Sequence, residues 1–520
     1  MVWSTSRDEN MNQLNFPVLL VSILIPLVLS ISFPFLGKKL KASKLAIVSI
    51  VLLLVPFVVI TSFSLSPVIR VGVVDPSFFS HPFVGSFSML LDPLSAPFAF
   101  GITLVTIVVA LFSAPYMEHR IEELKHEGLN PPSIGTYYML YTVFSAAMLG
   151  LVLATNLIEF YIFLELALLP SFFLIIWYGY GNRTRIAIMY LLWTHIGGLI
   201  FLLGILTFGS STGTFDILNL RTLTFNLGLG STLPIAVMLL ITIGLFVKMA
   251  IFGVHIWLPY AHAEAPTPVS ALLSPALIGI AGYSLIRISY TLFTVQFEAI
   301  SIYLVVLALI TMIYGGLMAL AQDDFKRLLA YSSISQMGYI LLGISTLTTN
   351  GIAGGVLHFV THAVGKSILF MVAGTIIFQF KGLRSISKMG GLAQRVPNLL
   401  ILALIGFMFL MGMPPTLGLW SKLNIVVGTF DRVLGFGNLA LVLISITIVV
   451  ATGITAAYSF LTLKRIFFGN LPNELKGEKI PAWSKLTVAI VAVTVVGLIL
   501  FFYPAVFIDP LKSFLESIFG

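Results

Sequence analysis

The sequence contains no cysteine and very few charged residues. Of its 520 residues, 9% are Asp, Glu, Lys or Arg, against roughly 25% in an ordinary soluble chain. The lack of cysteine excludes thiolate zinc sites, cysteine-ligated iron–sulfur clusters and thiol catalysis within this chain. The low charge excludes a soluble globular domain, a disordered chain and a nucleic-acid-binding module.

Hydrophobic residues make up 58% of the chain. Since a helix that crosses a bilayer needs about 20 mostly apolar residues, the sequence predicts an all-α integral membrane protein with about fourteen transmembrane helices. Apolar runs between polar, Pro or Gly residues place these spans at 16–36, 45–67, 92–115, 136–155, 157–178, 186–209, 233–258, 268–291, 299–321, 327–346, 351–379, 398–425, 436–463 and 485–508.

The distribution of the 28 Lys and Arg residues predicts the orientation. Most of them, among them Lys38 and Lys326, fall in or beside loops that follow odd-numbered spans, and only a few, such as Arg287, fall on the side of the termini. The positive-inside rule therefore places both termini outside the cytoplasm. Three lysines lie instead within predicted spans: Lys248, Lys366 and Lys422.

The fifth and seventh spans each contain one ionisable residue that we single out, Glu165 and Lys248. A charge near the centre of a spanning helix costs roughly 2.5–3.5 kcal/mol on insertion scales, so such residues are functional candidates. If the two helices adjoin, the acid and the amine could neutralise each other. The alternative is a static ion pair that only holds two helices together.

The eleventh span carries His358, His362 and Lys366 at intervals of four residues. Successive side chains drift by only about 40° around a helix at this spacing, so all three share one face. We interpret them, Lys366 included, as a row of proton-exchanging groups. Packing histidines are one explanation. A metal site is another, because two histidines four residues apart can chelate, although no carboxylate or cysteine accompanies them.

Two predicted spans combine a buried lysine with a helix-disrupting segment. Pro414 and Pro415 precede Lys422 in the twelfth span, and Gly253 and then His255 follow Lys248 in the seventh. Broken helices are tolerated at membrane depth where other helices or water satisfy the freed backbone groups. Ordinary kinking is the alternative explanation.

Spans seven and twelve are five helices apart, and an odd offset implies opposite orientations. Paired interrupted helices in corresponding halves indicate inverted repeats with ion sites near the midplane. We therefore predict one polytopic membrane domain over 1–520: helices one to three over 16–115, a first inverted five-helix unit over 136–291, a second over 299–463, and a last helix over 485–508.

These groups suit proton transport better than catalysis. Burial destabilises a charged lysine and a nearby carboxylate stabilises it, so movement of the acid would bind or release a proton. Histidine titrates near neutrality, which suits a relay at His358 and His362. The sequence has no nucleophile paired with a base, no phosphate loop and no dinucleotide fingerprint. We assign no catalytic, cofactor-binding or metal-binding residues.

Several segments around these residues resemble a known family. The anchors are LDPLSAPFAF, NLIEFYIFLELALLPSFFLI, FVKMAIFGVHIWLPYAHAEAPTPVSALLS, DDFKRLLAYSSISQMGY, LHFVTHAVGKSILF, MPPTLGLWSKL and FLTLKRIFFG. Together they are similar to the antiporter-like subunits of respiratory complex I, of the chain M or chain 4 type. These subunits are related to multi-subunit cation/proton antiporters and membrane-bound hydrogenases.

The resemblance implies a function and a setting. It implies fourteen helices, two inverted half-channels and proton translocation through Glu165, Lys248 and Lys422, driven by oxidoreduction in a separate arm. The chain would not be catalytic alone. Iron–sulfur clusters, flavin or a nickel site would lie in partner subunits. The partners would be antiporter-like and small membrane subunits, quinone-site and iron–sulfur subunits and the lipid bilayer, in a prokaryotic plasma membrane, without nucleic acid.

The sequence departs from the family pattern in three places. Gly279 stands where a bridging lysine is common, so water or the Tyr283 hydroxyl would have to substitute. Ala250 and Gly253 stand in place of common prolines, which leaves Gly253 as the flexible point. Lys422 stands where chain M subunits often carry glutamate.

Two other functions stay open on the sequence. One is a subunit of a monovalent cation/proton antiporter or of a membrane-bound hydrogenase. The other is a scaffold whose buried charges only hold helices together. In the proton path that we favour, His255 and Tyr283 would be auxiliary groups.

Overall fold

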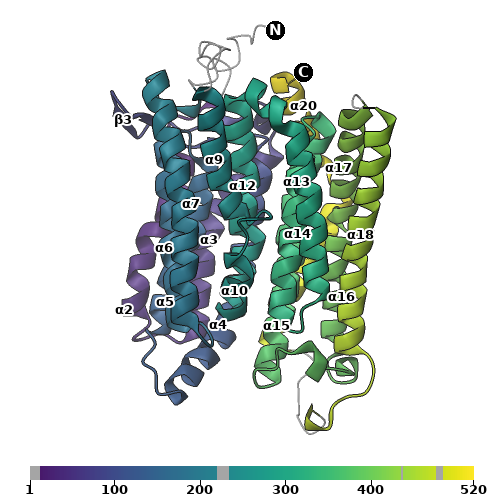
Figure 1. Cartoon of the computed structure of the whole chain (residues 1–520). Coiled ribbons are helices and arrows are strands. Elements are labelled where there is room, and N and C mark those ends of the chain that lie inside the picture. The colour runs from purple at the N-terminus through teal and green to yellow at the C-terminus, as the bar shows by residue number, and fades with distance from the viewer. Residues whose placement is uncertain (1–11, 219–232, 435–436, 476–483, 520) are drawn as a thin grey trace.

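The computed structural model covers residues 1–520, and the structure is described for residues 12–218, 233–434, 437–475 and 484–519. Long helices stand side by side and form one bundle (Figure 1). Within the described residues, 12 helices are long and apolar enough to cross a membrane. The predicted all-α membrane fold is therefore confirmed.

The first part of the bundle begins with a broken span followed by five long or medium helices. Its helices are α1 Val18–Leu29, α2 Phe33–Leu36, α3 Ala42–Leu65, α4 Ser95–His126, α5 Ile134–Leu153, α6 Leu157–Tyr178 and α7 Arg183–Thr212. The segment after α7 continues with α9 Leu233–Met249, α10 Trp257–Glu264, α11 Thr267–Leu272 and α12 Ile278–Ser284, with π-helical turns η5 Leu273–Leu277 and η6 Leu285–Tyr290 around α12.

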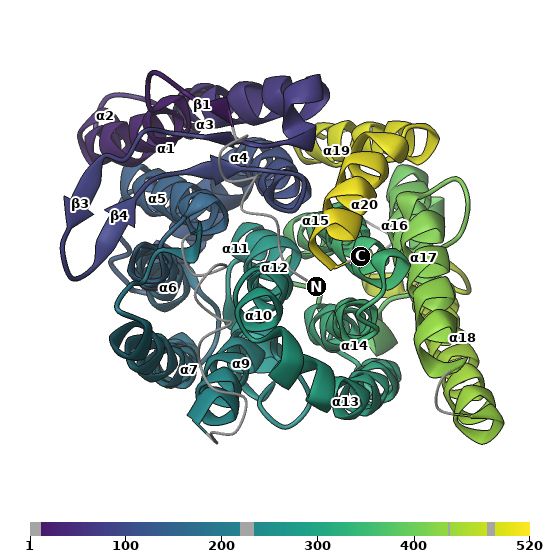
Figure 2. The ribbon, with the colours of Figure 1, turned by 90° about the horizontal axis from the view of Figure 1, so that it is seen from above.

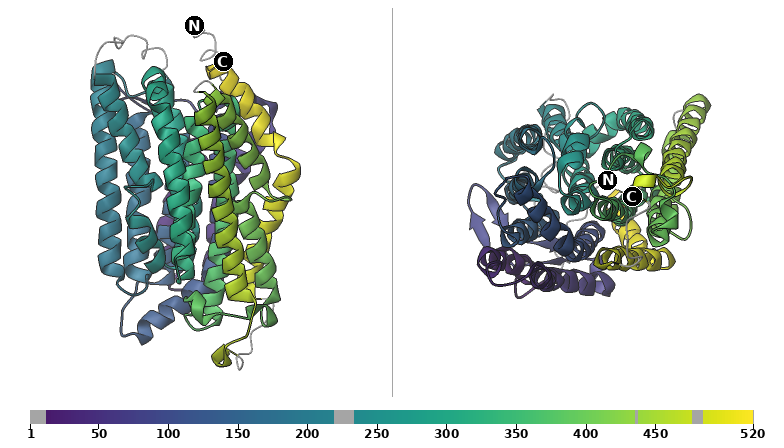
Figure 3. Two further views of the ribbon diagram at one scale, coloured as in Figure 1. Left: turned by 45° about the vertical axis from the view of Figure 1, so that its right-hand side comes forward. Right: turned by 90° about the horizontal axis from the view of Figure 1, so that it is seen from below.

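The second part repeats the succession of long helices with one interrupted pair. Its helices are α13 Thr294–Leu320, α14 Phe325–Ser345, α15 Thr349–Gln379, α16 Pro397–Met411, α17 Leu417–Val433, α18 Asn438–Phe467 and α19 Lys485–Phe502. Figure 3 shows the helices of the two parts standing next to each other. The total of fourteen crossings and the inversion of the two units stay predictions.

Most boundaries agree with the predicted spans within about six residues, with two exceptions. Helix α17 ends at Val433, whereas the sequence suggested an end at 425. Helix α4 ends at His126, where the sequence suggested an end at 115. Arg120 explains part of this extension, because its guanidinium is buried and binds the carbonyl oxygen of Gly179 at 2.6 Å. Residue 436, where the thirteenth predicted span begins, lies outside the described residues.

Both predicted helix interruptions are present. Helix α9 ends at Met249 and α10 begins at Trp257, and the indole nitrogen of Trp257 donates to the carbonyl oxygen of Val247 at 2.9 Å. Helix α16 ends at Met411 and α17 begins at Leu417. In that second gap the Thr416 hydroxyl donates to the carbonyl oxygen of Met413 at 2.6 Å. Side chains thus satisfy backbone groups that the breaks leave free, as the membrane interior requires.

Helix α15 lies at the centre of the second part. Its spanning window is entirely buried, and it packs against α4, α11, α14, α16, α17 and α19. Figure 2 shows α11, α12, α14 and α15 in the middle, with α6, α7, α13 and α18 on the outside. The row of titratable residues on α15 therefore faces protein on every side.

One end of the bundle carries short strands and a helix that the sequence analysis did not identify. The strands are β1 Asn12–Gln13, β2 Val73–Val74 and β5 Leu90–Leu91 in one sheet, with a hairpin of β3 Phe79–His81 and β4 Gly85–Phe87. Helix α20, Ala505–Phe519, packs on α15 and on the turn η3 Pro67–Arg70 before β2. The two described ends of the chain thus lie at the same end of the bundle, which we call the terminal end (Figure 1).

Candidate functional site

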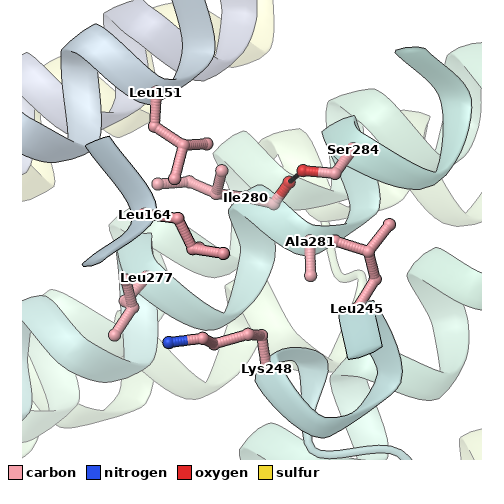
Figure 4. A pocket seen from close by; sticks show the side chains of 8 residues that line it. All are labelled: Leu151, Leu164, Leu245, Lys248, Leu277, Ile280, Ala281 and Ser284. Atoms are coloured by element: carbon pink, nitrogen blue, oxygen red, sulfur yellow. Dashed lines mark hydrogen bonds between the residues drawn. The ribbon is translucent and has the colours of Figure 1, made fainter. Parts of the chain in front are cut away.

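Lys248 is the buried cation of the first part. It lies at the end of α9, directly before the interruption, and is 5% exposed. Its side chain lines a cavity of about 10 Å³, close to the space that one water molecule needs. In Figure 4 the amine points among apolar side chains, and the hydroxyl of Ser284 lies at the other side of the cavity.

Glu165 makes its ion pair with a histidine that the sequence analysis did not single out. Glu165 Oε2 lies 2.9 Å from Nδ1 of His195 on α7. The other oxygen, Oε1, is buried without a hydrogen-bond partner in the described part of the chain. Glu165 is within electrostatic range of Lys248, but no ion pair of 4.0 Å or less joins them. In this conformation the predicted pair is therefore open.

Glycines on α7 allow this helix to pack closely against α6, which carries Glu165, and α9, which carries Lys248. A Cβ atom on Gly198 would lie 2.5 Å from Oε1 of Glu165, and one on Gly197 would lie 2.7 Å from the side chain of Val247, the neighbour of Lys248. Only glycine leaves room for these approaches. Little more than the backbone of α7 thus lies between the acid on α6 and the lysine on α9.

Lys422 on α17 is the buried cation of the second part. Its amine lies 4.0 Å from the centre of the Tyr339 ring on α14, and it has no hydrogen-bond partner among the described residues. Gly412 has a φ of +80° in the interruption, and a Cβ there would lie 2.8 Å from Cδ of Lys422. The break therefore provides the space that the lysine stem occupies.

His358 connects three helices by hydrogen bonds. Its Nδ1 lies 3.0 Å from the Ser421 hydroxyl on α17, and its Nε2 lies 3.0 Å from Oε1 of Gln336 on α14. The amide of Gln336 then donates to the Tyr458 hydroxyl on α18 at 3.2 Å. The centre of the His358 ring also lies 5.4 Å from that of the Tyr339 ring, which contacts the Lys422 amine, so this network passes near the buried amine.

His362 and His262 are fully buried, and both ring nitrogens of each lack a hydrogen-bond partner within the described residues. His362 lies within electrostatic range of His358, Lys366 and His262. Its unpaired nitrogens leave the proton of the ring free to change position. His262, on α10 after the first interruption, was missed in the sequence analysis, although its place beside a broken helix was a usable signal.

Two lysines near these histidines are held by fixed partners. Lys366 donates to the carbonyl oxygen of Leu329 at 2.7 Å and to the Ser332 hydroxyl. Lys326 is also fully buried and donates to the carbonyl oxygens of Ala263 and Ala265. Lys326 lies at the start of α14, beside the loop after α13, and its amine reaches back to the turn between α10 and α11 and joins that turn to α14.

The space beside Gly279 is filled by an aromatic ring. A Cβ on Gly279 would lie 2.4 Å from the ring of Phe359 on α15, and one on Gly101 of α4 would lie 2.9 Å from the same ring. The ring also stacks against Phe98, with a centroid distance of 4.4 Å. A longer side chain at position 279 has no room here, and an apolar ring occupies the space beside the position where the family commonly has a lysine.

The two auxiliary groups have partners of their own. His255 lies in the first interruption, but its Nε2 contacts the Tyr314 hydroxyl on α13 at 3.1 Å, and it does not line the Lys248 cavity. Tyr283 accepts a hydrogen bond from Nε of Arg287 at 3.0 Å. Arg287 in turn binds both oxygens of Asp92 at 2.6 and 2.7 Å. Arg287 is 2% exposed and forms a buried ion pair.

The remaining predicted positions are helix-break residues. Gly253 has a φ of +94° with no atom near a Cβ position, and Pro414 and Pro415 lie in the gap between α16 and α17. The described residues contain no group of three or more His, Asp and Glu side chains arranged for a metal ion.

Fold and buried groups together define a multi-pass membrane protein with cations placed at interrupted helices. Comparison with known proteins assigns its family. Residues 154–450 match the family described as NADH:quinone oxidoreductase/Mrp antiporter, TM, and residues 79–124 match the complex I chain 5 N-terminus family. The chain belongs to the NADH:quinone oxidoreductase/Mrp antiporter membrane-subunit family, as the sequence motifs indicated.

The relatives agree with this assignment. The chain is 33% identical over 393 residues to F(420)H(2) dehydrogenase subunit M of Methanosarcina mazei, covering 74% of this chain and 76% of the relative. It is 31% identical over 472 residues to NAD(P)H-quinone oxidoreductase chain 4-2 of Synechocystis, covering 88% and 79%.

Solved structures share the fold. A chain of respiratory complex I from Thermus thermophilus superposes with a TM-score of 0.80 at 24% identity, over 96% of this chain and 100% of that chain. A chain of the Mrp complex from Dietzia superposes with a TM-score of 0.81 at 20% identity, over 97% and 99%.

Proposed function

We propose that this chain is the proton-translocating membrane subunit, chain M-like, of an oxidoreductase of the complex I type. The observation that carries the proposal is the placement of Lys248 and Lys422, two buried lysines that each lie beside a helix interruption. The Lys422 amine also lacks a hydrogen-bond partner in the described chain. Burying an amine at membrane depth costs free energy, so such residues are rare and usually functional. The family assignment supports the same function.

The path would run from Glu165 and Lys248 in 136–291 to the α15 row and Lys422 in 299–463, the two inverted units. The Phe359 ring beside Gly279 would block a direct proton route between the two units. His262 would provide a different route, because it is within electrostatic range of Lys366 and of His362. In this scheme Lys366 stays fixed and orients the row, while His262, His362 and His358 pass protons.

The family also supports a proposal for the setting of the chain. We place the chain in a prokaryotic plasma membrane with both termini outside the cytoplasm, beside other antiporter-like and small membrane subunits. The relatives named as subunits of NAD(P)H-quinone oxidoreductase and F(420)H(2) dehydrogenase support a separate arm that carries the redox groups. The electron donor, the quinone-site and iron–sulfur subunits, and any flavin or nickel, then belong to partners.

Exchange of monovalent cations for protons is the second candidate. The likeness of the fold to a chain of the Mrp complex from Dietzia, with a TM-score of 0.81, favours it as strongly as the complex I likeness favours pumping. The two functions differ in their energy source. Pumping requires an electron donor, whereas exchange requires only a sodium or potassium gradient.

The test uses the assembled complex in proteoliposomes with a pH-sensitive dye. Lys248→Met is expected to abolish the acidification that follows addition of the electron donor, while the complex still assembles. Lys388→Met is the matched control, because this lysine is exposed in a connecting segment, and it should leave acidification unchanged. Unchanged pumping in Lys248→Met would overturn the proposal. Proton flux driven by sodium without a donor would favour the antiporter.

A further inference from the structure

His195 is a polar side chain on an apolar, outward-facing surface of the bundle. It belongs to the outer face of α7, between Leu192 and Leu199, which are 55% and 45% exposed. The His195 side chain is itself 44% exposed in the isolated chain. Its distance from the start of α7, twelve residues of about 1.5 Å each, puts it deep in the membrane layer. A polar group at such a depth usually has a specific partner.

Glu165 lies on the neighbouring outer face of α6. Ile162 and Leu169, one turn before and after it, are 50% and 49% exposed. The two polar side chains therefore meet on the apolar outside of the bundle, where α6 and α7 lie next to each other (Figure 2). An ionised carboxylate only accepts hydrogen bonds, so Nδ1 of His195 carries the hydrogen of their 2.9 Å contact.

The inner side of the same carboxylate has no partner. Oε1 is buried against Gly198, and Leu164, the residue before Glu165, lines the Lys248 cavity. The carboxylate is thus bonded on its outer oxygen only, although a buried amine lies within electrostatic range on the other side. Two partners, His195 and Lys248, are thus available to one acid.

We propose that His195 is a positioning residue that holds the Glu165 carboxylate on the outer face of α6 and α7, and so keeps it out of contact with Lys248. Proton release from Lys248 requires the acid to be away from the amine, because a paired carboxylate stabilises the charged form. His195 thereby sets how often Lys248 is unpaired. The consequence for transport rests on the proposed function, but the position of Glu165 does not.

The experiment is a structure of the assembled complex with His195→Leu. Leucine fills the same stripe and removes the competing hydrogen bond, so Glu165 is expected to turn inward to an ion-pair contact with Lys248. His195→Asn places an amide nitrogen at the same distance from the backbone as Nδ1, and it should keep Glu165 where it is. Leu199→Ala, on the same exposed stripe, is the control. A carboxylate that stays outside in His195→Leu overturns the proposal.

Transport provides an independent measurement. His195→Leu is expected to slow donor-driven proton translocation roughly tenfold, because a closed ion pair must open in every cycle, and His195→Asn should restore it. If Glu165 turns inward in His195→Leu but translocation stays at the wild-type rate, the role of His195 in transport is overturned. The claim that His195 holds the Glu165 carboxylate on the outer face would still stand. If His195→Leu fails to assemble, Lys248→Met decides: Glu165 should still contact His195, and a carboxylate that leaves His195 would overturn the proposal.

Discussion

The two buried lysines have opposite surroundings. Lys248 faces a water-sized cavity and a carboxylate, Glu165, that is bonded elsewhere. Lys422 faces the ring of Tyr339 and no carboxylate forms an ion pair with it within the described chain. A carboxylate can move and change its own charge, whereas a tyrosine ring inside a packed bundle offers a permanent, neutral surface.

This difference suggests different controls on the two amines. The charge of Lys248 depends on where Glu165 lies, so it can be switched by a side-chain movement. The Lys422 amine has no hydrogen-bond partner within the described chain, and the residue before it, Ser421, belongs to the hydrogen-bonded row of His358. On the proposed function, we expect the first part of the molecule to change its affinity for a proton and the second part to pass the proton along.

The largest effect that would sharpen this comparison is expected at Tyr339. Tyr339→Leu removes the ring under Lys422, and the lost cation–π attraction of up to about 2 kcal/mol disfavours the charged amine. We expect donor-driven proton translocation in proteoliposomes to fall by roughly tenfold. Tyr339→Phe keeps the ring and should retain most of the rate, even though it loses the hydroxyl contact with Thr452 at 3.1 Å. Equal losses in both variants would contradict a role for the ring.

A smaller effect, on stability, is expected at the contact between the two parts. Gly279→Ala places a methyl group against Phe359, which cannot retreat because Gly101 touches its other edge. Overpacking of this kind costs about 1–3 kcal/mol. The thermal unfolding midpoint of the purified complex should fall. Gly453→Ala, a helical position with no atom within 4 Å of the new methyl, is the control, and it should leave the midpoint equal or slightly higher.

Phe359→Leu tests the contact between position 279 and the Phe359 ring by making the ring's side chain smaller. Combined with Gly279→Ala it should recover part of the lost stability, because the smaller side chain vacates the space that the methyl needs. A double variant that is less stable than both single variants would show that the ring is not what limits position 279.

The smallest effect is expected at the terminal end, far from both lysines. Asp75 lies in the segment after β2 and accepts hydrogen bonds from the amides of Leu19 and Leu20 at 3.2 and 2.7 Å. Burial raises the pKa of Asp75 from 3.8 to about 6. Folding then favours the protonated form, so local stability should rise as the pH falls from about 6 towards 4 and be lost again as the pH rises through 6.

Hydrogen exchange of the first turn of α1 measures this pH dependence. The exchange of wild-type protein relative to Asp75→Asn should slow as the pH falls through 6, because the asparagine does not titrate. Asp509→Asn, at an exposed position of α20, should give no such difference. A ratio that stays constant from pH 4 to pH 8 would contradict the burial of Asp75.

The sequence predicts the spans well because long apolar runs have few other uses. It also identifies Lys248, Lys422, His358 and His362, since isolated charges in apolar runs are conspicuous. It does not predict that Glu165 contacts His195, because that contact depends on how α7 is rotated against α6. A single histidine in an apolar run does not show which neighbouring helix it faces.

Other misses have different physical causes. Lys326 and Arg287 lie at helix ends, where sequence alone cannot separate a solvated flank from a charge folded back into the bundle. The Phe359 ring beside Gly279 reflects packing between distant helices. Helix α20 was missed although its buried residues Phe507, Leu511, Leu515 and Ile518 recur at helical spacing, because it is too short and polar to resemble a span.

One measurement tests the central claim, that the two parts form one path in series. Protons translocated per electron are counted in proteoliposomes for wild type, Lys248→Met, Lys422→Met and the double variant. A path in series predicts that each single variant loses the whole contribution of this chain and that the double variant loses no more. A loss in the double variant equal to the two single losses added together would contradict the account, because it would mean two independent paths.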